Sequence, residues 1–249
     1  MPLTTKPLPN EVHELEIISL VIIGVPKPLV RIGEERLIDR LVRIFVANNA
    51  TQIAVICRPA TAYSQTGEEK SPSVCDYLYS LQQQINIPLH VISKVTPSSM
   101  HSMFELSGLL NDEPFVLTTV DTVFREREFA DYVNAFSHLL EMDEADGLMG
   151  VTDYIDDEKP LYVETADDMR ITAFLDSCQN PRFISGGIYG LTPRSLQTLQ
   201  HCMERGESRM RNFQRALITD GLRLKAYAFS KVLDIDHVSD ILKAEQFLR

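Results

Sequence analysis

The segment Val25-Pro26-Lys27-Pro28 directly follows the apolar run of residues 17–23. We expect that run to be a buried strand, and open α/β sheets bind their ligands just beyond the carboxyl ends of their strands. The prolines on either side of Lys27 restrict the backbone and keep the segment rigid and non-helical. Lys27 is therefore a candidate for binding a phosphate group at that edge of the sheet.

Asp121 is the second candidate, because it follows the apolar run Phe115–Val120. A carboxylate at the end of a buried strand faces the cleft above the sheet, where it could bind a metal ion. The alternative is an aspartate that only accepts hydrogen bonds from the amides of the turn. Position in the sequence leaves both interpretations open.

Composition limits the classes of partner. The chain has 249 residues, 44% of them hydrophobic, and a formal net charge of -11. This predicts one domain over residues 1–249, with residues 1–15 as a flexible N-terminal segment. A nucleic-acid partner is not expected, because phosphate backbones are bound through basic surfaces. A small phosphate ligand is compatible with the charge, since a few cations, backbone amides and a metal ion can bind it.

The sequence has neither an apolar run of about 20 residues, as needed to cross a bilayer, nor the apolar core of a secretion signal. We therefore expect a soluble, cytoplasmic protein without a membrane partner. The four cysteines are widely separated and lack the spacing of a zinc site. We expect reduced, mostly structural thiols at Cys57, Cys75, Cys178 and Cys202.

Alternating strand and helix patterns predict an α/β fold with a mostly parallel, Rossmann-like sheet and helices on both faces. Strands are expected at residues 17–23, 52–57, 89–93, 115–120, 147–151 and 222–229. Helices are expected at residues 34–49, 74–81, 125–142, 194–203, 208–219 and 238–248, with one more starting near Ser98. Short strand patterns at residues 160–163, 171–174 and 188–191 predict a small antiparallel elaboration beside the sheet.

The order of these motifs resembles the sugar-phosphate nucleotidyltransferases and the related molybdopterin-guanylyltransferase-like NTP transferases. In that family Pro-Lys-Pro follows the first strand, as here, and a later strand closes with a metal-binding aspartate, as in Glu113–Asp121. The segment Leu233–Ile241 resembles the second acidic motif, whose first aspartate completes the metal site. This match assigns Asp234 and leaves Asp236 to cap the last helix. The resemblance covers residues 17–248 and implies a nucleotide-diphospho-sugar transferase-like fold.

The resemblance also implies a reaction. A nucleoside monophosphate group would move from a nucleoside triphosphate to a phosphorylated small molecule, most simply a sugar 1-phosphate, with release of pyrophosphate. The catalytic residues would be Lys27, Asp121 and Asp234: Lys27 would bind phosphate, and the two aspartates would hold Mg²⁺ as the cofactor. Mg²⁺ prefers carboxylate and phosphate oxygens and neutralises the charge that develops on the phosphates.

Further binding residues follow from the same resemblance. The segment Thr96–Ser102 is similar to the family segment that lines the base pocket, and Ser185–Tyr189 is similar to the Gly-Ile-Tyr strand at the acceptor pocket. The residues implied for nucleotide binding are Gly24, Lys27, Ser98 and Ser99. Those implied for acceptor binding are Asp176, Gly186, Gly187 and Tyr189. Helix capping by the serines and a β-bulge at the glycines are the structural alternatives.

The sequence departs from the family at two places. Only Gly24 and Val25 stand where the family has a glycine-rich loop, and Leu175–Ser177 replaces its Glu-Lys-Pro. Arg209 and Arg211 could supply the missing cation or form a solvated helix face. Two other functions stay open: a non-catalytic relative that binds or regulates through its cleft, and a related glycosyltransferase. The base, the acceptor and the oligomeric state stay open as well, and a homo-oligomer is compatible with the sequence.

Overall fold

The structure is a computed structural model that describes residues 27–59, 73–110, 113–156 and 159–249. The strand expected at residues 17–23, Gly24, and most of the segment between Arg58 and Ser73 lie outside these residues. Within the described ranges, no helix is long and apolar enough to span a membrane.

The helices agree with the sequence prediction to within a few residues. Their bounds are η1 (Lys27–Leu29), α1 (Leu37–Ala47), α2 (Val74–Gln82), α3 (Ser99–Ser107), α4 (Glu126–Glu141), α5 (Arg194–Glu204), α6 (Met210–Thr219) and α7 (Val238–Leu248). The predicted start near Ser98 is confirmed, because the Ser98 hydroxyl accepts a hydrogen bond from the amide of His101 at the N-terminus of α3. Such a cap satisfies a backbone donor that the first helical turn leaves without a partner.

The fold is α/β, as predicted. Its strands are β1 (Arg31–Ile32), β2 (Glu35–Arg36), β3 (Ile53–Cys57), β4 (Leu89–Ser93), β5 (Phe115–Thr118), β6 (Thr122–Val123), β7 (Gly147–Thr152), β8 (Tyr162–Thr165), β9 (Ile171–Leu175), β10 (Phe183–Leu191), β11 (Leu224–Phe229) and β12 (Leu233–Asp234). Strands β3 and β4 pair in parallel, and so do β7 and β11. Strand β10 pairs antiparallel with β5, β7 and β8. Contrary to the prediction, the six-stranded sheet is not mostly parallel: its β7–β11 pair is parallel and its other pairs are antiparallel.

The position of β10 corrects one detail of the prediction. We expected the antiparallel strands to lie beside the sheet, and β8 and β9 do lie at one side of it. Strand β10 instead lies between β5 and β7, which therefore run in the same direction as each other. The reversed strand is thus part of the centre of the six-stranded sheet.

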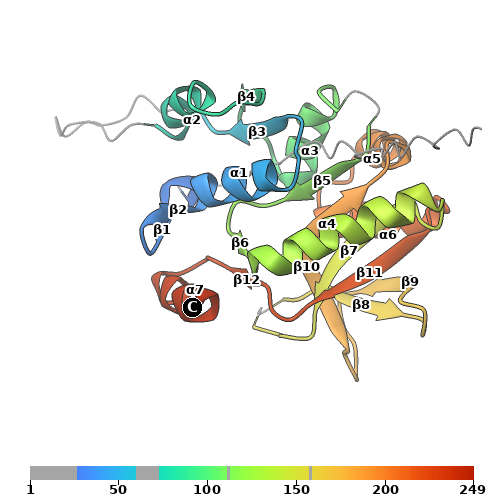
Figure 1. Ribbon diagram of the computed structural model, residues 1–249. Coiled ribbons are helices and arrows are strands. Elements are labelled where there is room, and N and C mark those ends of the chain that lie inside the picture. The colour runs from blue at the N-terminus through green and yellow to red at the C-terminus, as the bar shows by residue number, and fades with distance from the viewer. Residues whose placement is uncertain (1–26, 60–72, 111–112, 157–158) are drawn as a thin grey trace, which may run out of the picture.

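Helices cover both faces of this sheet, as predicted. Helix α4 packs on one face, and Figure 1 shows it lying across β7, β10 and β11. Helices α3, α5 and α6 pack on the other face. Each face of the sheet has its own hydrophobic core, and alternate residues of a strand belong to different cores. Leu148 and Ile188 face α4, whereas Met149 and Tyr189 face the three other helices. This is the period-two pattern of a sheet that is buried on both sides.

Gly190 is the position where β10 comes closest to α4. A Cβ atom there would lie 2.8 Å from the hydroxyl of Tyr132 and 2.9 Å from the ring of Phe136. Because both aromatic residues are buried, we expect Gly190→Ala to lower the free energy of unfolding by about 2–3 kcal/mol. Urea denaturation measures this change. Gly108→Ala is the matched control, since a Cβ there meets no atom within 4 Å; equal midpoints for the two variants would contradict this packing.

Asp146 is a buried carboxylate immediately before β7. It accepts hydrogen bonds from the Arg223 amide at 2.7 Å and from the Arg194 guanidinium at 2.6 Å. Burial raises the pKa of Asp146, but the hydrogen bonds from Arg223 and Arg194 outweigh it and hold that pKa below its ordinary value of 3.8.

The ionised carboxylate of Asp146 therefore stabilises the fold above its unfolded-state pKa, and this contribution disappears as the pH falls. We expect the free energy of unfolding of the wild type to drop more steeply than that of Asp146→Asn between about pH 4 and pH 2. Denaturation curves measured over that range test this, and parallel pH profiles for the two proteins would contradict it.

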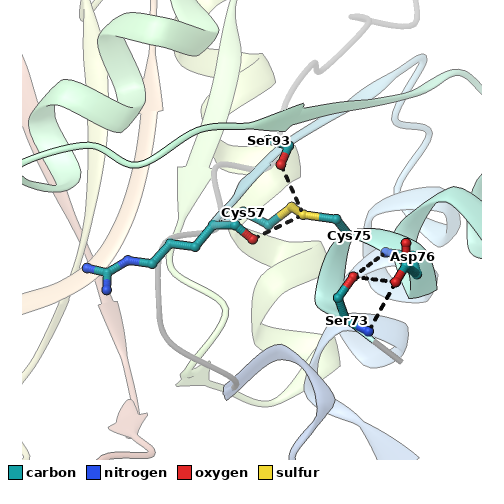
Figure 2. Close-up of a disulfide and its surroundings, with 6 residues drawn as sticks. Cys57, Ser73, Cys75, Asp76 and Ser93 are labelled. Carbon is teal, nitrogen blue, oxygen red and sulfur yellow. Dashed lines mark hydrogen bonds between the residues drawn. A yellow bond between two sulfur atoms is a disulfide. The ribbon is translucent and has the colours of Figure 1, made fainter. Parts of the chain in front are cut away.

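Cys57 and Cys75 form a disulfide, so the expectation of reduced thiols is wrong for this pair. Figure 2 shows the bridge between the end of β3 and the first turn of α2, which Ser73 and Asp76 cap. The two Cα atoms are 6.3 Å apart, within the range that a disulfide spans. Cys178 and Cys202 are free.

The disulfide determines how many cysteine thiols are free to react. Alkylation of the denatured protein, purified without reductant, is expected to modify two cysteines, and prior reduction is expected to expose all four. Reduction should also lower the free energy of unfolding by about 2–4 kcal/mol, because the bridge restrains the unfolded chain. Mass spectrometry gives the count; four modified cysteines before reduction would contradict the pairing.

Candidate functional site

The two aspartates proposed as metal ligands come together through the strand pair β6–β12. The chain turns at Thr119, slightly earlier than predicted, where the Thr119 carbonyl accepts a hydrogen bond from the Thr122 amide. Asp234 then pairs with Thr122 across the two short strands, and the Thr122 hydroxyl donates to the Asp234 carboxylate at 3.2 Å. The Ile235 amide donates to the backbone carbonyl of Asp121 at 3.0 Å. Asp121 and Asp234 are therefore neighbours in space.

Lys27 joins this group through its ammonium. The Nζ atom lies 2.7 Å from the Asp121 carboxylate and 2.6 Å from that of Asp236. Asp121 is shielded from water, with 15% of its side chain exposed. Desolvation lowers the pKa of Lys27, but the hydrogen bonds and charges of Asp121 and Asp236 outweigh it and raise that pKa to about 12. Lys27 therefore stays cationic at neutral pH.

Asp236 has a different role from the one predicted. We expected it to cap α7, but His237 occupies the N-cap position, and the Asp240 carboxylate accepts hydrogen bonds from the amides of Asp236 and His237. The Asp236 side chain pairs with Lys27 instead. The spacing Asp234-Ile235-Asp236 could have indicated that Asp236 belongs to the site, because alternate residues of an extended segment point the same way.

The oxygen atoms near this turn are of the kind that a hard divalent cation prefers. Besides the carboxylates of Asp121 and Asp234, the hydroxyls of Thr119 and Thr122 lie within 2.6 Å of each other at the same turn. Oxygen-only sites suit Mg²⁺. The described residues contain no group of three or more acidic, His or Cys side chains that could hold a metal by themselves. Two carboxylates completed by substrate phosphates are a common arrangement for Mg²⁺.

A cavity of about 520 Å³ opens beside Asp234. Its walls include five of the residues assigned from the sequence: Ser98, Ser99, Gly187, Tyr189 and Asp234. The nucleotide-side and acceptor-side residues therefore surround one space. Lys27 and Asp121 lie outside the described lining of this cavity, next to the wall that Thr122 forms.

The paired glycines form the bulge that the sequence left as one alternative. The register of β10 against β7 shifts between Ser185 and Ile188. Gly187 has a φ of +70°, and a Cβ there would lie 3.3 Å from the Thr122 hydroxyl. Gly186 lines a second cavity, of about 710 Å³, that also borders Asp234 and Asp236. The bulge therefore brings the backbone of β10 close to Thr122 and Asp234.

The sequence matches no family model and no curated relative. Solved structures with the same architecture include the inositol-1-phosphate CTP transferase from T. maritima, with TM-score 0.70, 15% identity, and coverage of 95% of this chain and 98% of that one. A UTP-bound UGPase from Acinetobacter baumannii has TM-score 0.70 and 14% identity, with coverage of 94% and 93%. A putative glucose-1-phosphate thymidylyltransferase from Bacillus anthracis has TM-score 0.73 and 16% identity, with coverage of 94% and 95%.

The chain has the same fold as these sugar-phosphate nucleotidyltransferase structures. At these identities the likeness concerns the fold, and the chemistry has to be argued from the residues of this chain.

Asp176, which the nucleotidyltransferase pattern assigns to acceptor binding, forms ion pairs and lies outside the described cavity lining. Asp176 is exposed at the end of β9, outside the described lining of the 520 Å³ cavity. Its carboxylate pairs with Arg211 at 2.6 Å and with Arg215 at 2.8 Å. The hydrogen bonds from Arg215 and Arg211 lower the pKa of Asp176. Asp176 thus holds the guanidinium of Arg211 in place.

Three cations line the cavity, although this chain lacks the lysine of the family's Glu-Lys-Pro motif at Leu175–Ser177. They are Lys159, before β8, with Arg209 and Arg211, at the start of α6. The Arg211 guanidinium donates to the backbone carbonyl of Lys159 at 3.2 Å, which joins the two segments. Both arginines could be identified from the sequence, whereas Lys159 was not. The sequence signal for Lys159 was Glu158-Lys159-Pro160, which has the residues of the family's Glu-Lys-Pro motif but stands earlier in the chain.

Proposed function

We propose that this protein transfers a nucleoside monophosphate group from a nucleoside triphosphate to a phosphorylated small molecule, a sugar 1-phosphate in the simplest case, and releases pyrophosphate. The observation that carries the proposal is the ion pair of Lys27 with Asp121, next to the strand pair β6–β12 that carries Asp234, beside a cavity lined by three cations. The sugar-phosphate nucleotidyltransferase fold supports it.

Asp121 and Asp234 would hold Mg²⁺, and the bound ion would supply charge neutralisation at the phosphates. Lys27 would place its ammonium on the same phosphates, exchanging its carboxylate partners for phosphate oxygens. Because the phosphate oxygens are anionic like the carboxylates they would replace, they would keep the ammonium charged. A fixed positive charge lowers the barrier most where negative charge develops on the transferring group.

The two substrates would meet in the 520 Å³ cavity. Ser98 and Ser99, at the N-terminal end of α3, would contribute to nucleotide binding together with Gly24 and Lys27; a helix N-terminus favours anionic groups. Lys159, Arg209 and Arg211 would bind the phosphate of the acceptor. Gly186, Gly187 and Tyr189 would line the acceptor side.

The domain organisation, the compartment and the partners of the protein are also proposed. We infer a single domain over residues 1–249 that works in the cytoplasm, as expected from the sequence, without a nucleic-acid partner. The formal net charge of -11 supports the last point. A homo-oligomer is compatible with the proposal.

The test is a product assay with each nucleoside triphosphate, Mg²⁺ and a panel of sugar 1-phosphates. We expect pyrophosphate and a nucleotide sugar from at least one combination. Release of a nucleoside diphosphate from a nucleotide sugar would instead indicate the glycosyltransferase alternative. Absence of both turnover and calorimetric binding with every triphosphate would indicate the non-catalytic alternative and contradict the proposal.

A further inference from the structure

Helix α6 carries a buried amide on its apolar face. Gln214 is 3% exposed and lies next to Phe213 in a helix whose other buried residues are apolar. Burying an amide costs free energy unless its donors and acceptor find partners. An apolar side chain at this position would pack in the core without needing hydrogen-bond partners. Packing alone therefore does not explain the glutamine.

Gln214 connects two residues of strand β10 at the wall of the 520 Å³ cavity. The Ser185 hydroxyl donates to Gln214 Oε1 at 3.1 Å, and Gln214 Nε2 donates to the Tyr189 hydroxyl at 3.5 Å. All three residues line that cavity. Burial raises the pKa of Tyr189 to about 12. The phenol therefore stays neutral at physiological pH, and the group carries no charge.

The hydrogen-bonding capacity of this group matches a hydroxyl. An amide nitrogen has two hydrogens, so Gln214 can donate a second hydrogen bond while its oxygen is held by Ser185. A serine oxygen has two acceptor lone pairs, so Ser185 can accept a proton while it donates its own to Gln214. A ligand hydroxyl both donates and accepts, and so satisfies both residues together. A dianionic phosphate has no proton to offer Ser185.

The cavity thus has two parts of different chemistry. Its cations, Lys159, Arg209 and Arg211, come from the segments before β8 and α6, whereas Ser185 and Gln214 form a neutral wall at the β10 bulge. We propose that Ser185 and Gln214 bind a hydroxyl group of the acceptor and select polyhydroxylated phosphate esters over esters that lack this hydroxyl. The inference rests on the proposed function in treating this ligand as the acceptor.

Binding measured without nucleotide tests the inference separately from the reaction. The probes are glucose 1-phosphate and myo-inositol 1-phosphate, with methyl phosphate as the ester that lacks hydroxyls. By calorimetry, the wild type is expected to bind at least one polyhydroxylated ester about tenfold more tightly than methyl phosphate, or better. Gln214→Met, which keeps the side-chain volume, and Ser185→Ala should each remove most of this preference and leave methyl phosphate binding unchanged.

The matched control is Gln200→Met on α5, an exposed glutamine whose amide donates to Glu204; it should keep the full preference. Thermal unfolding identifies any variant that fails to fold, and Ser185→Ala then decides alone. Equal affinities of the wild type for all three esters would overturn the inference, and so would an undiminished preference in a folded Gln214→Met or Ser185→Ala protein. A protein that shows the preference and releases no pyrophosphate with any triphosphate would overturn the proposed reaction and retain this binding site.

Discussion

Asp121→Asn and Asp234→Asn are each expected to lower the rate of pyrophosphate release by about 10²–10³-fold. Asparagine keeps the size of the side chain but removes the charge that a divalent cation requires. The strand pair β6–β12 depends on backbone hydrogen bonds, so the fold should survive both changes. Steady-state kinetics with saturating Mg²⁺ measures the effect.

Asp131→Asn provides the control for these two variants. Asp131 is exposed on α4, on the helix that covers one face of the sheet, and is not among the site residues. Its turnover should match that of the wild type. Full activity in either Asp121→Asn or Asp234→Asn, measured beside this control, would remove the proposed metal site from the mechanism.

Lys27→Met is expected to change two properties in opposite directions. Turnover should fall by about 10²-fold or more, because the phosphates lose a fixed cation. Binding of Mn²⁺ without nucleotide should become tighter, because an ammonium 2.7 Å from the Asp121 carboxylate no longer repels the ion. Titration calorimetry with Mn²⁺ and the product assay measure the two effects on one preparation.

The opposite signs separate this account from a structural role for Lys27. If the lysine only held Asp121 and Asp236 together, its loss would disorder the carboxylates and weaken Mn²⁺ binding along with turnover. Weaker Mn²⁺ binding in a folded Lys27→Met protein would therefore contradict the proposed contact with phosphate.

Most of the fold could be predicted because hydrophobic period and capping are local signals. Helix α7 spans Val238–Leu248, as its apolar spacing indicates, and Ser98 caps α3. The antiparallel direction of β10 was predicted from its short connections, but its place between β5 and β7 had no such signal, because the pairing partners of a strand depend on tertiary structure. The Cys57–Cys75 pair also depends on tertiary structure, because the parallel pairing of β3 with β4 and the packing of α2 bring the two cysteines together.

The residues of the candidate site also differ in whether a local sequence signal identifies them. The position of Asp121 after a strand and the motif around Asp234 were visible in the sequence, and β6–β12 pairing brings them together. Lys159 was not identified because its Glu-Lys-Pro sequence stands earlier in the chain than the family motif, and Gln214 was not identified because a glutamine in an amphipathic helix is an ordinary feature of a sequence. Only the cavity that they share with Tyr189 gives them a role.

A crystal structure of the protein with Mn²⁺ and a nucleoside triphosphate tests the central claim most directly. The account predicts one anomalous peak within about 2.2 Å of a carboxylate oxygen from both Asp121 and Asp234, with phosphate oxygens completing the coordination and the Lys27 ammonium on the same phosphates. An ion bound to neither carboxylate, or carboxylates too far apart to share one ion in the nucleotide complex, would contradict it.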